Sequence, residues 1–253
     1  NLLLLGGHVG REGAGFCPVR GHSNVQGDRT VGIWEAPSDS FMDKMEQGLK
    51  ISLPRKHGYD VVNSIKAMAD SKVEVFFCMG GNFLSATPDT RFTANALSNV
   101  DLVVQVSTKL NRSHIVTGKE ALILPCLGRT ELDIQKSGKQ FVSVENSMGI
   151  VHMSRGGLKP ASDLLKSEPW IVASLAAKTL KNSPIEWKEL ASSYDKIRDI
   201  MSDSLHGFED YNIRVREENG FYLPNPPRDS RTFQTDDGKA HFTTHSLPDV
   251  SVE

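Results

Sequence analysis

The stretch from Cys17 to Ile33 carries the side chains of this sequence that are best suited to chemistry. It reads CPVRGHSNVQGDRTVGI, and it spaces polar side chains between glycines with almost no hydrophobic periodicity. Glycine adopts positive φ without strain and lets backbone N–H groups approach a ligand closely. A ligand-binding loop and an ordered Ω-loop are equally good interpretations of this stretch alone. The residues that could contact a ligand are Arg20, Gly21, His22, Asn24, Gln26 and Gly27.

The three cysteines favour reduced thiols over a metal site. Cys17, Cys78 and Cys126 lie far apart, are odd in number and lack CxxC spacing. We therefore expect a reducing compartment, the cytoplasm, and no metal site made by this chain alone. Cys78 lies in an apolar run and is expected in the core, and Cys17 has no partner spacing that would make it a metal ligand.

Charge and hydropathy exclude two classes of partner. The net charge is −2, with 29 Lys and Arg against 31 Asp and Glu, so neither nucleic acid nor an anionic membrane surface is expected as a partner. No apolar run reaches the roughly 20 residues that span a bilayer. The opening NLLLLGG is interpreted as the end of a strand or helix.

Three apolar runs of the sequence are predicted to be strands, and their ends could hold a ligand site. They are VEVFFCM at 73–79, DLVVQVS at 101–107 and EALILP at 120–125. The first run is continuous and rich in β-branched and aromatic residues, which predicts a strand buried on both faces. Helical patterns separate the runs, so the alternation predicts an α/β fold with a Rossmann-like parallel sheet flanked by helices.

Two helices are expected around these strands. Tyr59 to Asp70 places apolar residues on one helical stripe. A second helix is expected to begin at Pro88, with Thr87 as its N-cap. The apolar stripe of the first helix consists of Val61, Val62, Ile65, Met68 and Ala69.

Small and polar residues follow two of the strands. Gly80, Gly81 and Asn82 come after the first strand, and Ser107 and Thr108 end the second. In parallel sheets ligands bind beyond the carboxyl ends of the strands, where free N–H groups face anions. These strand ends suit a nucleotide or phosphate better than a metal.

After Pro125 the pattern changes. Gln140 to Ser154 alternates and turns near Asn146, which predicts a hairpin in a small β subregion. A helix is expected from Glu168 to Leu180. The sequence SPIEWKEL then predicts a helix with Ser183 as N-cap, Pro184 first and Glu186 completing a capping box. Its expected apolar face is Trp187, Leu190, Tyr194, Ile197 and Met201.

Several motifs carry a resemblance to a known family. LLLLGGHVGREGAGFCPVRGHSNVQGD resembles the part of molybdopterin-dependent formate dehydrogenases with the general form R-x-G-x-G-x-x-P-x-R-G-x-x-N-V-Q-G. MGGN, ALILPCLGRTELD and DGKAHF resemble later motifs of the family, and together they cover nearly the whole chain. LPCLGRTELDIQKSGKQFVSVENSMGIVH is most similar to the FdhF/YdeP branch of the dimethyl sulfoxide reductase superfamily.

The resemblance implies a molybdenum bis(molybdopterin guanine dinucleotide) cofactor and two-electron chemistry on a small substrate, with a redox partner as electron acceptor. Arg20 occupies the position that holds an anionic substrate, and His22 lies beside it as a second catalytic residue. Asn24 and Gln26 would pair with the pterin, while Gly21 and Gly27 allow close approach. The residues implied at the guanine dinucleotide are Gly80, Gly81, Asn82, Ser107, Thr108 and Glu168.

The chain departs from the family at several positions. His22 replaces a Gln of formate dehydrogenases, so the resemblance does not fix formate as the substrate. Phe83 replaces a Pro, and Leu132 replaces a Lys of related nitrate reductases. The cysteine cluster that binds the family's four-iron four-sulfur centre and the molybdenum ligand both precede the matched region. We therefore expect an internal piece of a longer enzyme, inactive alone.

The resemblance also implies a division of the chain. Residues 1–28 would end a preceding domain and form the cofactor loop, and 29–135 would form the α/β cofactor domain. Residues 136–220 would form the hairpin and helices. Residues 221–253 would be a linker and the start of a β-barrel, whose first strand is expected in DDGKAHFTTHSL at 236–247.

Two alternatives to this enzyme differ in class. A nicotinamide dehydrogenase would need G-x-G-x-x-G at its first strand and an acidic residue about twenty positions later, and the sequence has neither. A non-catalytic scaffold that kept the fold without the cofactor stays open at this point.

Overall fold

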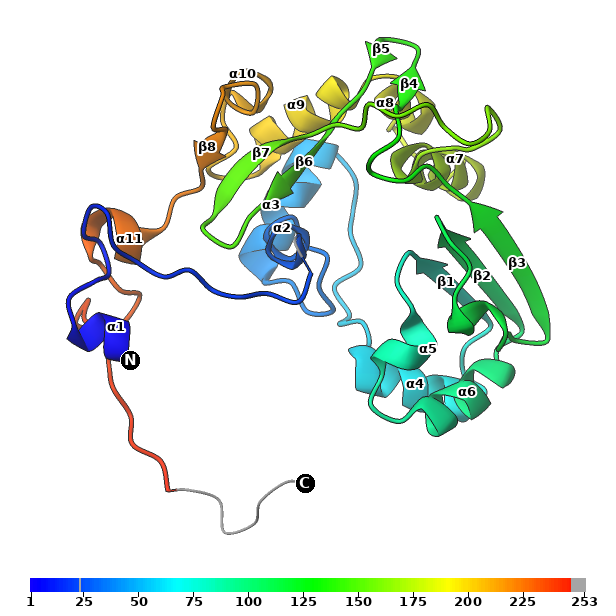
Figure 1. Ribbon diagram of the computed structural model, residues 1–253, viewed down its shortest axis with the longest axis horizontal. Helices are drawn as coiled ribbons and strands as arrows, with labels where there is room; N and C mark the ends of the chain where they lie inside the picture. The colour runs from blue at the N-terminus through cyan, green and yellow to red at the C-terminus, as the bar shows by residue number, and fades with distance from the viewer. Residues whose placement is uncertain (23, 247–253) are drawn as a thin grey trace.

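The computed structural model describes residues 1–22 and 24–246, and its first unit is a parallel sheet (Figure 1). The strands β1 (Val75–Met79), β2 (Leu102–Ser107) and β3 (Glu120–Pro125) pair in the order β1-β2-β3. All pairs are parallel, which confirms the predicted α/β class.

Helices α4 (Val61–Ala69), α5 (Phe83–Ala86) and α6 (Thr90–Ser98) lie on one side of this sheet, and a 3-10 turn, η1 (Arg112–His114), follows β2 (Figure 1). Asp60 caps α4 by accepting a hydrogen bond from Asn63 N at 2.7 Å. The helices and β2 share a buried core of Ile65, Met68, Leu84, Ala96, Leu97, Val100 and Val103.

The expectation that the first strand is buried on both faces is wrong. β1 is an edge strand, and its Val75 is 56% exposed. β2 alone of the three has a neighbour on each side, and its Val106 is fully buried. The predicted stripe of α4 is also only partly buried, because Val61 and Val62 are exposed while Ile65 and Met68 are buried.

The predicted start of α6 is wrong by two residues. Asp89 is the N-cap, and its Oδ1 accepts from Phe92 N at 2.8 Å. Thr87 is buried, and its hydroxyl bonds the Thr93 hydroxyl at 2.8 Å. Thr87 is thus committed to the core and cannot cap the helix.

The second unit is an antiparallel sheet of β6 (Val142–Glu145), β7 (Ile150–Ser154) and β8 (Phe221–Tyr222). Val144 pairs with His152, and Asn146 N donates to Ile150 O at 2.9 Å across the turn. The predicted hairpin is therefore confirmed.

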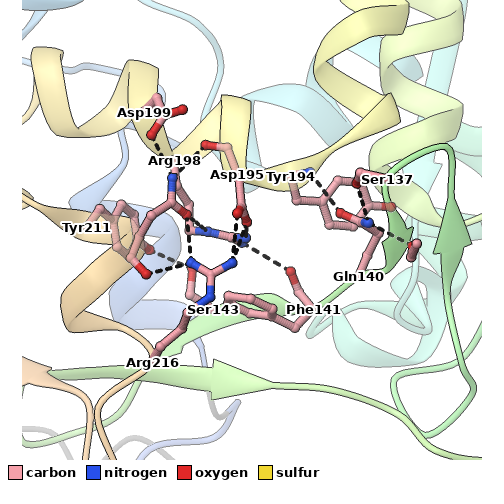
Figure 2. Close-up of polar contacts among 12 residues, drawn as sticks. Ser137, Gln140, Phe141, Ser143, Tyr194, Asp195, Arg198, Asp199, Tyr211 and Arg216 are labelled. Atoms are coloured by element: carbon pink, nitrogen blue, oxygen red, sulfur yellow. Dashed lines mark hydrogen bonds and ion pairs between the residues drawn. The ribbon is translucent and has the colours of Figure 1, made fainter.

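Helices α3 (Asp39–Leu49), α9 (Tyr194–Ser204) and α10 (Tyr211–Arg214) pack with this second sheet. The buried Arg198 of α9 joins α10 to the segment before β6, because it bonds Asn212 Oδ1 at 2.7 Å and Phe141 O at 3.1 Å (Figure 2). The apolar part of this core consists of Phe141, Val151, Leu205, Phe208, Tyr211, Val215, Phe221 and Leu223.

Between the two sheets lie α7 (Glu168–Thr179), α8 (Trp187–Ser192) and the short hairpin of β4 (Ile134–Gln135) and β5 (Gly138–Lys139). The predicted start of α7 at Glu168 is confirmed.

The capping box and the single helix predicted after α7 are wrong. Ser183 Oγ accepts from Ile185 N at 3.2 Å, and α8 begins only at Trp187. The helix is then interrupted at Ser193, whose backbone is extended. Tyr194 N donates to Gln140 Oε1 at 2.9 Å. This long-range bond starts α9 as a separate helix.

The terminal segments contain α1 (Leu2–Leu5), α2 (Val25–Thr30) and α11 (Pro226–Ser230). Arg231 Nε donates to Gly10 O at 3.2 Å, so the segment after α1 lies beside α11 (Figure 1). The strand expected at 236–247 is absent from its described part, 236–246, where Thr235 to Lys239 form a hydrogen-bonded turn. No helix of the described chain is long and apolar enough to cross a membrane.

Candidate functional site

The carboxyl ends of the parallel strands lie at one edge of the sheet. Met79 pairs with Val106, and Gly80 N donates to Val106 O at 2.7 Å. Cys126 N donates to Ser107 O at 3.2 Å at the end of the next strand. The glycine turn after β1 and the serine that ends β2 are therefore neighbours.

The glycine turn after β1 leaves its backbone open. Gly80 has φ 68° and Gly81 has φ 72°, a left-handed region that favours glycine. A Cβ added at Gly81 would meet nothing within 4 Å, and one at Gly80 would meet only Glu168 Oε1 at 3.9 Å. The turn can therefore be approached closely by a ligand.

Asn82 and Ser107 are used to hold this edge together. Asn82 Oδ1 accepts from Ser113 Oγ at 2.9 Å, and Asn111 Nδ2 donates to Gly81 O at 2.8 Å. Ser107 Oγ donates to Lys109 O at 2.7 Å. The loop after β2 is thereby fixed to the turn after β1. Ser113 and Asn111, which do this, were not expected from the sequence.

A cavity of about 330 Å³, the central cavity, lies beside this edge. It brings together four of the residues expected from the sequence, because the loop before α2 reaches the ends of β2 and α7. Its polar lining includes His22, Asn24, Thr108, Arg129, Glu131, Arg155 and Glu168. Gly80, Gly81, Asn82 and Ser107 lie at the sheet edge outside this lining.

Glu168 brings a carboxylate to the central cavity from the first turn of α7. Burial raises the pKa of Glu168 above its ordinary value, although the residue as a whole is exposed. No described residue donates a hydrogen bond to this carboxylate, so its oxygens are available to donors on a ligand.

Arg129 and Arg155 bring two positive charges to the central cavity, whose lining also holds the carboxyl groups of Glu131, Asp133 and Glu168. Neither guanidinium pairs with a carboxylate among the described residues, although both line the cavity. Glu131 fixes the wall between them, since its carboxylate accepts from Gly128 N at 2.7 Å and Ala161 N at 3.0 Å. A Cβ at Gly156 would lie 2.1 Å from Glu131 O, so only glycine allows this wall to close. No sequence motif marked either arginine.

Arg20 and Gln26 lie on a different cavity. This second cavity, the amino-terminal cavity, has a volume of about 510 Å³ and is also lined by Arg11 and Arg228. Arg20 and His22, expected together at one substrate position, therefore face separate cavities. Gly21, between them, has open space where a Cβ would be.

The amides of Asn24 and Gln26 are bonded within the protein. Asn24 Oδ1 accepts from Glu145 N at 2.9 Å, and Gln26 Nε2 donates to Glu145 Oε1 at 2.8 Å. A Cβ at Gly27 would lie 2.3 Å from Asn24 Oδ1, so glycine leaves room for the first bond. The pairing of both amides with a pterin stays a prediction, and Glu145 was missed because no local motif points to it.

Cys126, at the end of β3, should be unreactive in the folded protein. The residue is 3% exposed, and burial, with Glu168 and Glu131 nearby, raises the pKa of its thiol to about 11. On the order of one thiol in a thousand would then be ionised at pH 8. We expect iodoacetamide at pH 8 to alkylate the exposed Cys17 and to spare Cys126.

Peptide mass spectrometry would measure both cysteines in one sample. A urea-unfolded sample is the control, in which Cys126 should react as readily as Cys17. Equal labelling of the two thiols in the folded protein would contradict the prediction.

Among the described residues, no three or more His, Cys, Asp or Glu side chains are grouped so that they could hold a metal ion.

Comparison with known proteins identifies relatives along the whole chain. No protein-family model matches it. The chain is 53% identical over 253 residues to Uncharacterized oxidoreductase Rv2900c of Mycobacterium tuberculosis and 47% identical over 244 residues to Protein YdeP of Escherichia coli. These matches cover 100% and 96% of the chain, and 32% of each relative.

A more distant match links the chain to formate dehydrogenases. It is 25% identical over 211 residues to a formate dehydrogenase alpha subunit of Methanocaldococcus jannaschii, with 80% of the chain and 28% of that protein covered. The chain spans about a third of the length of these two curated relatives. It is thus a homologue of one region of proteins named as oxidoreductases, with formate dehydrogenase alpha subunits as weaker matches, and the predicted resemblance is confirmed.

Proposed function

We propose that this chain contributes to the cofactor site of a formate dehydrogenase-like molybdenum oxidoreductase that acts on a small anionic substrate. The observation that carries the proposal is the central cavity, where Thr108, Glu168 and two arginines meet the loop of His22. Oxidoreductase relatives and the distant formate dehydrogenase match support the same reaction class.

The donor set of this region fits a guanine dinucleotide. Arg129 and Arg155 can bind phosphate oxygens, and the open backbone at Gly81 can donate its N–H group to them. The available carboxylate of Glu168 matches the two neighbouring N–H donors of a guanine ring. A cavity of about 330 Å³ lies in the size range of small-molecule sites and would hold part of the cofactor.

When bound, a molybdenum bis(molybdopterin guanine dinucleotide) cofactor would supply two-electron redox chemistry. Gly80, Gly81, Asn82, Thr108 and Glu168 would hold the dinucleotide, with Ser107 supporting the strand end. A four-iron four-sulfur cluster, if the whole protein has one, would lie outside this segment.

Two of the chain's own residues would then bind the substrate anion and exchange a proton, each at its own cavity. Arg20 stays charged at any working pH and can pair with a planar anion. His22 Nδ1 accepts from Asn24 N at 3.3 Å, which leaves Nε2 to exchange a proton with a group in the central cavity, apart from the anion that Arg20 would bind at the amino-terminal cavity. A small-molecule substrate, a redox partner and a cytoplasmic location are part of this proposal. The three free cysteines support the location.

The proposal is tested by cofactor analysis of the whole protein. We expect molybdenum, a pterin and guanine nucleotide released by acid hydrolysis in fixed proportion to protein. A product free of metal and pterin would instead support the alternative, a non-catalytic scaffold that kept the fold.

Replacing Glu168 with alanine should release the cofactor without unfolding the protein. Hydrogen bonds to a charged group contribute about 1.5–3 kcal/mol, so cofactor affinity should fall roughly 10- to 150-fold. The loss of an acid from a helix first turn costs only some tenths of a kcal/mol in stability. Molybdenum and guanine content per protein, with circular dichroism, would measure both effects.

Glu186→Ala is the matched control, because Glu186 precedes α8 as Glu168 begins α7 but does not line the central cavity. Unchanged cofactor content in Glu168→Ala would mean that Glu168 only stabilises the first turn of α7 and does not bind the cofactor.

A further inference from the structure

A chain of three hydrogen bonds links the loop of Arg20 to strand β6. Arg20 Nη2 donates to Gln26 Oε1 at 2.9 Å, and Gln26 Nε2 donates to Glu145 Oε1 at 2.8 Å. Glu145 N in turn donates to Asn24 Oδ1 at 2.9 Å. Glu145 therefore holds the loop through both its backbone and its side chain, across 119 residues of sequence.

Burying the carboxyl group of Glu145 at this position costs free energy. The residue is 5% exposed, and its Oε2 is buried without a hydrogen-bond partner. An incompletely satisfied buried carboxyl group costs free energy that an apolar side chain of similar size would not. Stability of the β6–β7 hairpin therefore does not explain a glutamate at this position.

The carboxylate determines which way the Gln26 amide points. An ionised carboxylate only accepts hydrogen bonds, so the amide must turn its NH₂ group to Glu145 and its oxygen to the opposite side. That oxygen is the acceptor for Arg20, which only donates. Without an acceptor at residue 145 the amide could rotate and present NH₂ to the guanidinium, which breaks the bond.

Arg20 depends on this bond for its position. The residue is exposed, and Gln26 is the only hydrogen-bond acceptor that its guanidinium has among the described residues. An exposed arginine otherwise samples many rotamers and loses that freedom when it binds a ligand.

We propose that Glu145 is a positioning residue: it orients the Gln26 amide so that Gln26 holds the Arg20 guanidinium at the amino-terminal cavity. The value of this arrangement for substrate binding rests on the proposed function, in which Arg20 binds an anion.

The first test measures Arg20 itself in the whole protein. Phenylglyoxal modifies free guanidinium groups, and peptide mass spectrometry gives the rate at Arg20. Glu145→Met has similar volume but no acceptor, and it should raise this rate about three- to tenfold, the range expected for one lost hydrogen bond. Glu145→Gln keeps an acceptor oxygen and should restore the original rate.

Glu46→Met is the matched control. Glu46 also accepts a structural hydrogen bond, from Leu53 N at 2.7 Å, but it lies on α3 and does not line the cavity of Arg20. Its substitution should leave Arg20 reactivity unchanged. An unchanged rate in Glu145→Met, or a rate raised equally in Glu46→Met, would overturn the positioning role.

The second test uses formate as the probe anion and a double-mutant cycle. Glu145→Met should weaken formate binding, measured by calorimetry, about three- to tenfold in the original protein and not at all in an Arg20→Ala background. The same loss in both backgrounds would overturn the proposal. If Arg20 reactivity rises but formate binding is unaffected by Arg20→Ala, the positioning role stands and the substrate role of Arg20 fails.

Discussion

Replacing Arg198 with methionine is expected to lower the free energy of unfolding by about 1–3 kcal/mol for the buried hydrogen-bond acceptor that loses its donor. Arg198 is 4% exposed and forms a salt bridge with Asp195. Its loss would also leave Asn212 Oδ1 and Phe141 O without this donor (Figure 2). Burial lowers the pKa of Arg198 below its ordinary value, while Asp195 opposes that shift.

Arg216→Met is the matched control for this prediction. Arg216 bonds the same Asp195 at 2.7 Å and also lies over the Phe141 ring, but its side chain is 42% exposed. An exposed pair contributes about 1 kcal/mol or less. Urea denaturation of the protein and both variants would give the two values. A loss below about 1 kcal/mol for Arg198→Met would mean that the packed methionine replaces the network without cost.

The sheet and the hairpin could be predicted because their signals are local. Apolar runs at β1, β2 and β3 and alternation at β6 and β7 follow directly from neighbouring residues. Burial of β1 could not be predicted in this way, because it depends on whether a strand has one neighbour or two.

The predicted helix ends were wrong where a distant residue binds the group that was expected to cap the helix. The Thr87 hydroxyl is hydrogen-bonded to the Thr93 hydroxyl, so Asp89 caps α6 instead. The break before α9 depends on Gln140, which lies 54 residues away and binds Tyr194 N. A capping motif in the sequence shows which groups can form a hydrogen bond. It does not show which partner they bond in the folded protein.

The residues of the candidate site also divide into those that the sequence could predict and those that depend on distant contacts. The sequence marked Thr108, Glu168 and His22, and the fold brings all three to one cavity. It could not mark Arg129 and Arg155, because Arg129 stands at a variable position of its motif and Arg155 lies in a loop without one. The two meet only when the 126–133 and 155–158 segments pair.

Replacing Arg20 with alanine is expected to weaken binding of an anionic substrate by about 1.5–3 kcal/mol, the range for hydrogen bonds to a charged group. The corresponding loss of affinity is roughly 10- to 150-fold. Arg20 is exposed and bonds only the Gln26 side chain among the described residues, so its removal should change stability by no more than some tenths of a kcal/mol. Calorimetric titration of the whole protein with formate would measure the loss.

Arg91→Ala removes the same charge from an exposed position on α6 and should leave anion affinity within about twofold, which separates a direct contact from a change in overall charge. Molybdenum content must be measured in each variant, because a lost cofactor would also abolish binding. If Arg20→Ala keeps its cofactor and binds every tested anion as before, Arg20 does not bind substrate. Its bond to Gln26 would then only support the loop, and the substrate would have to be sought at His22 in the central cavity.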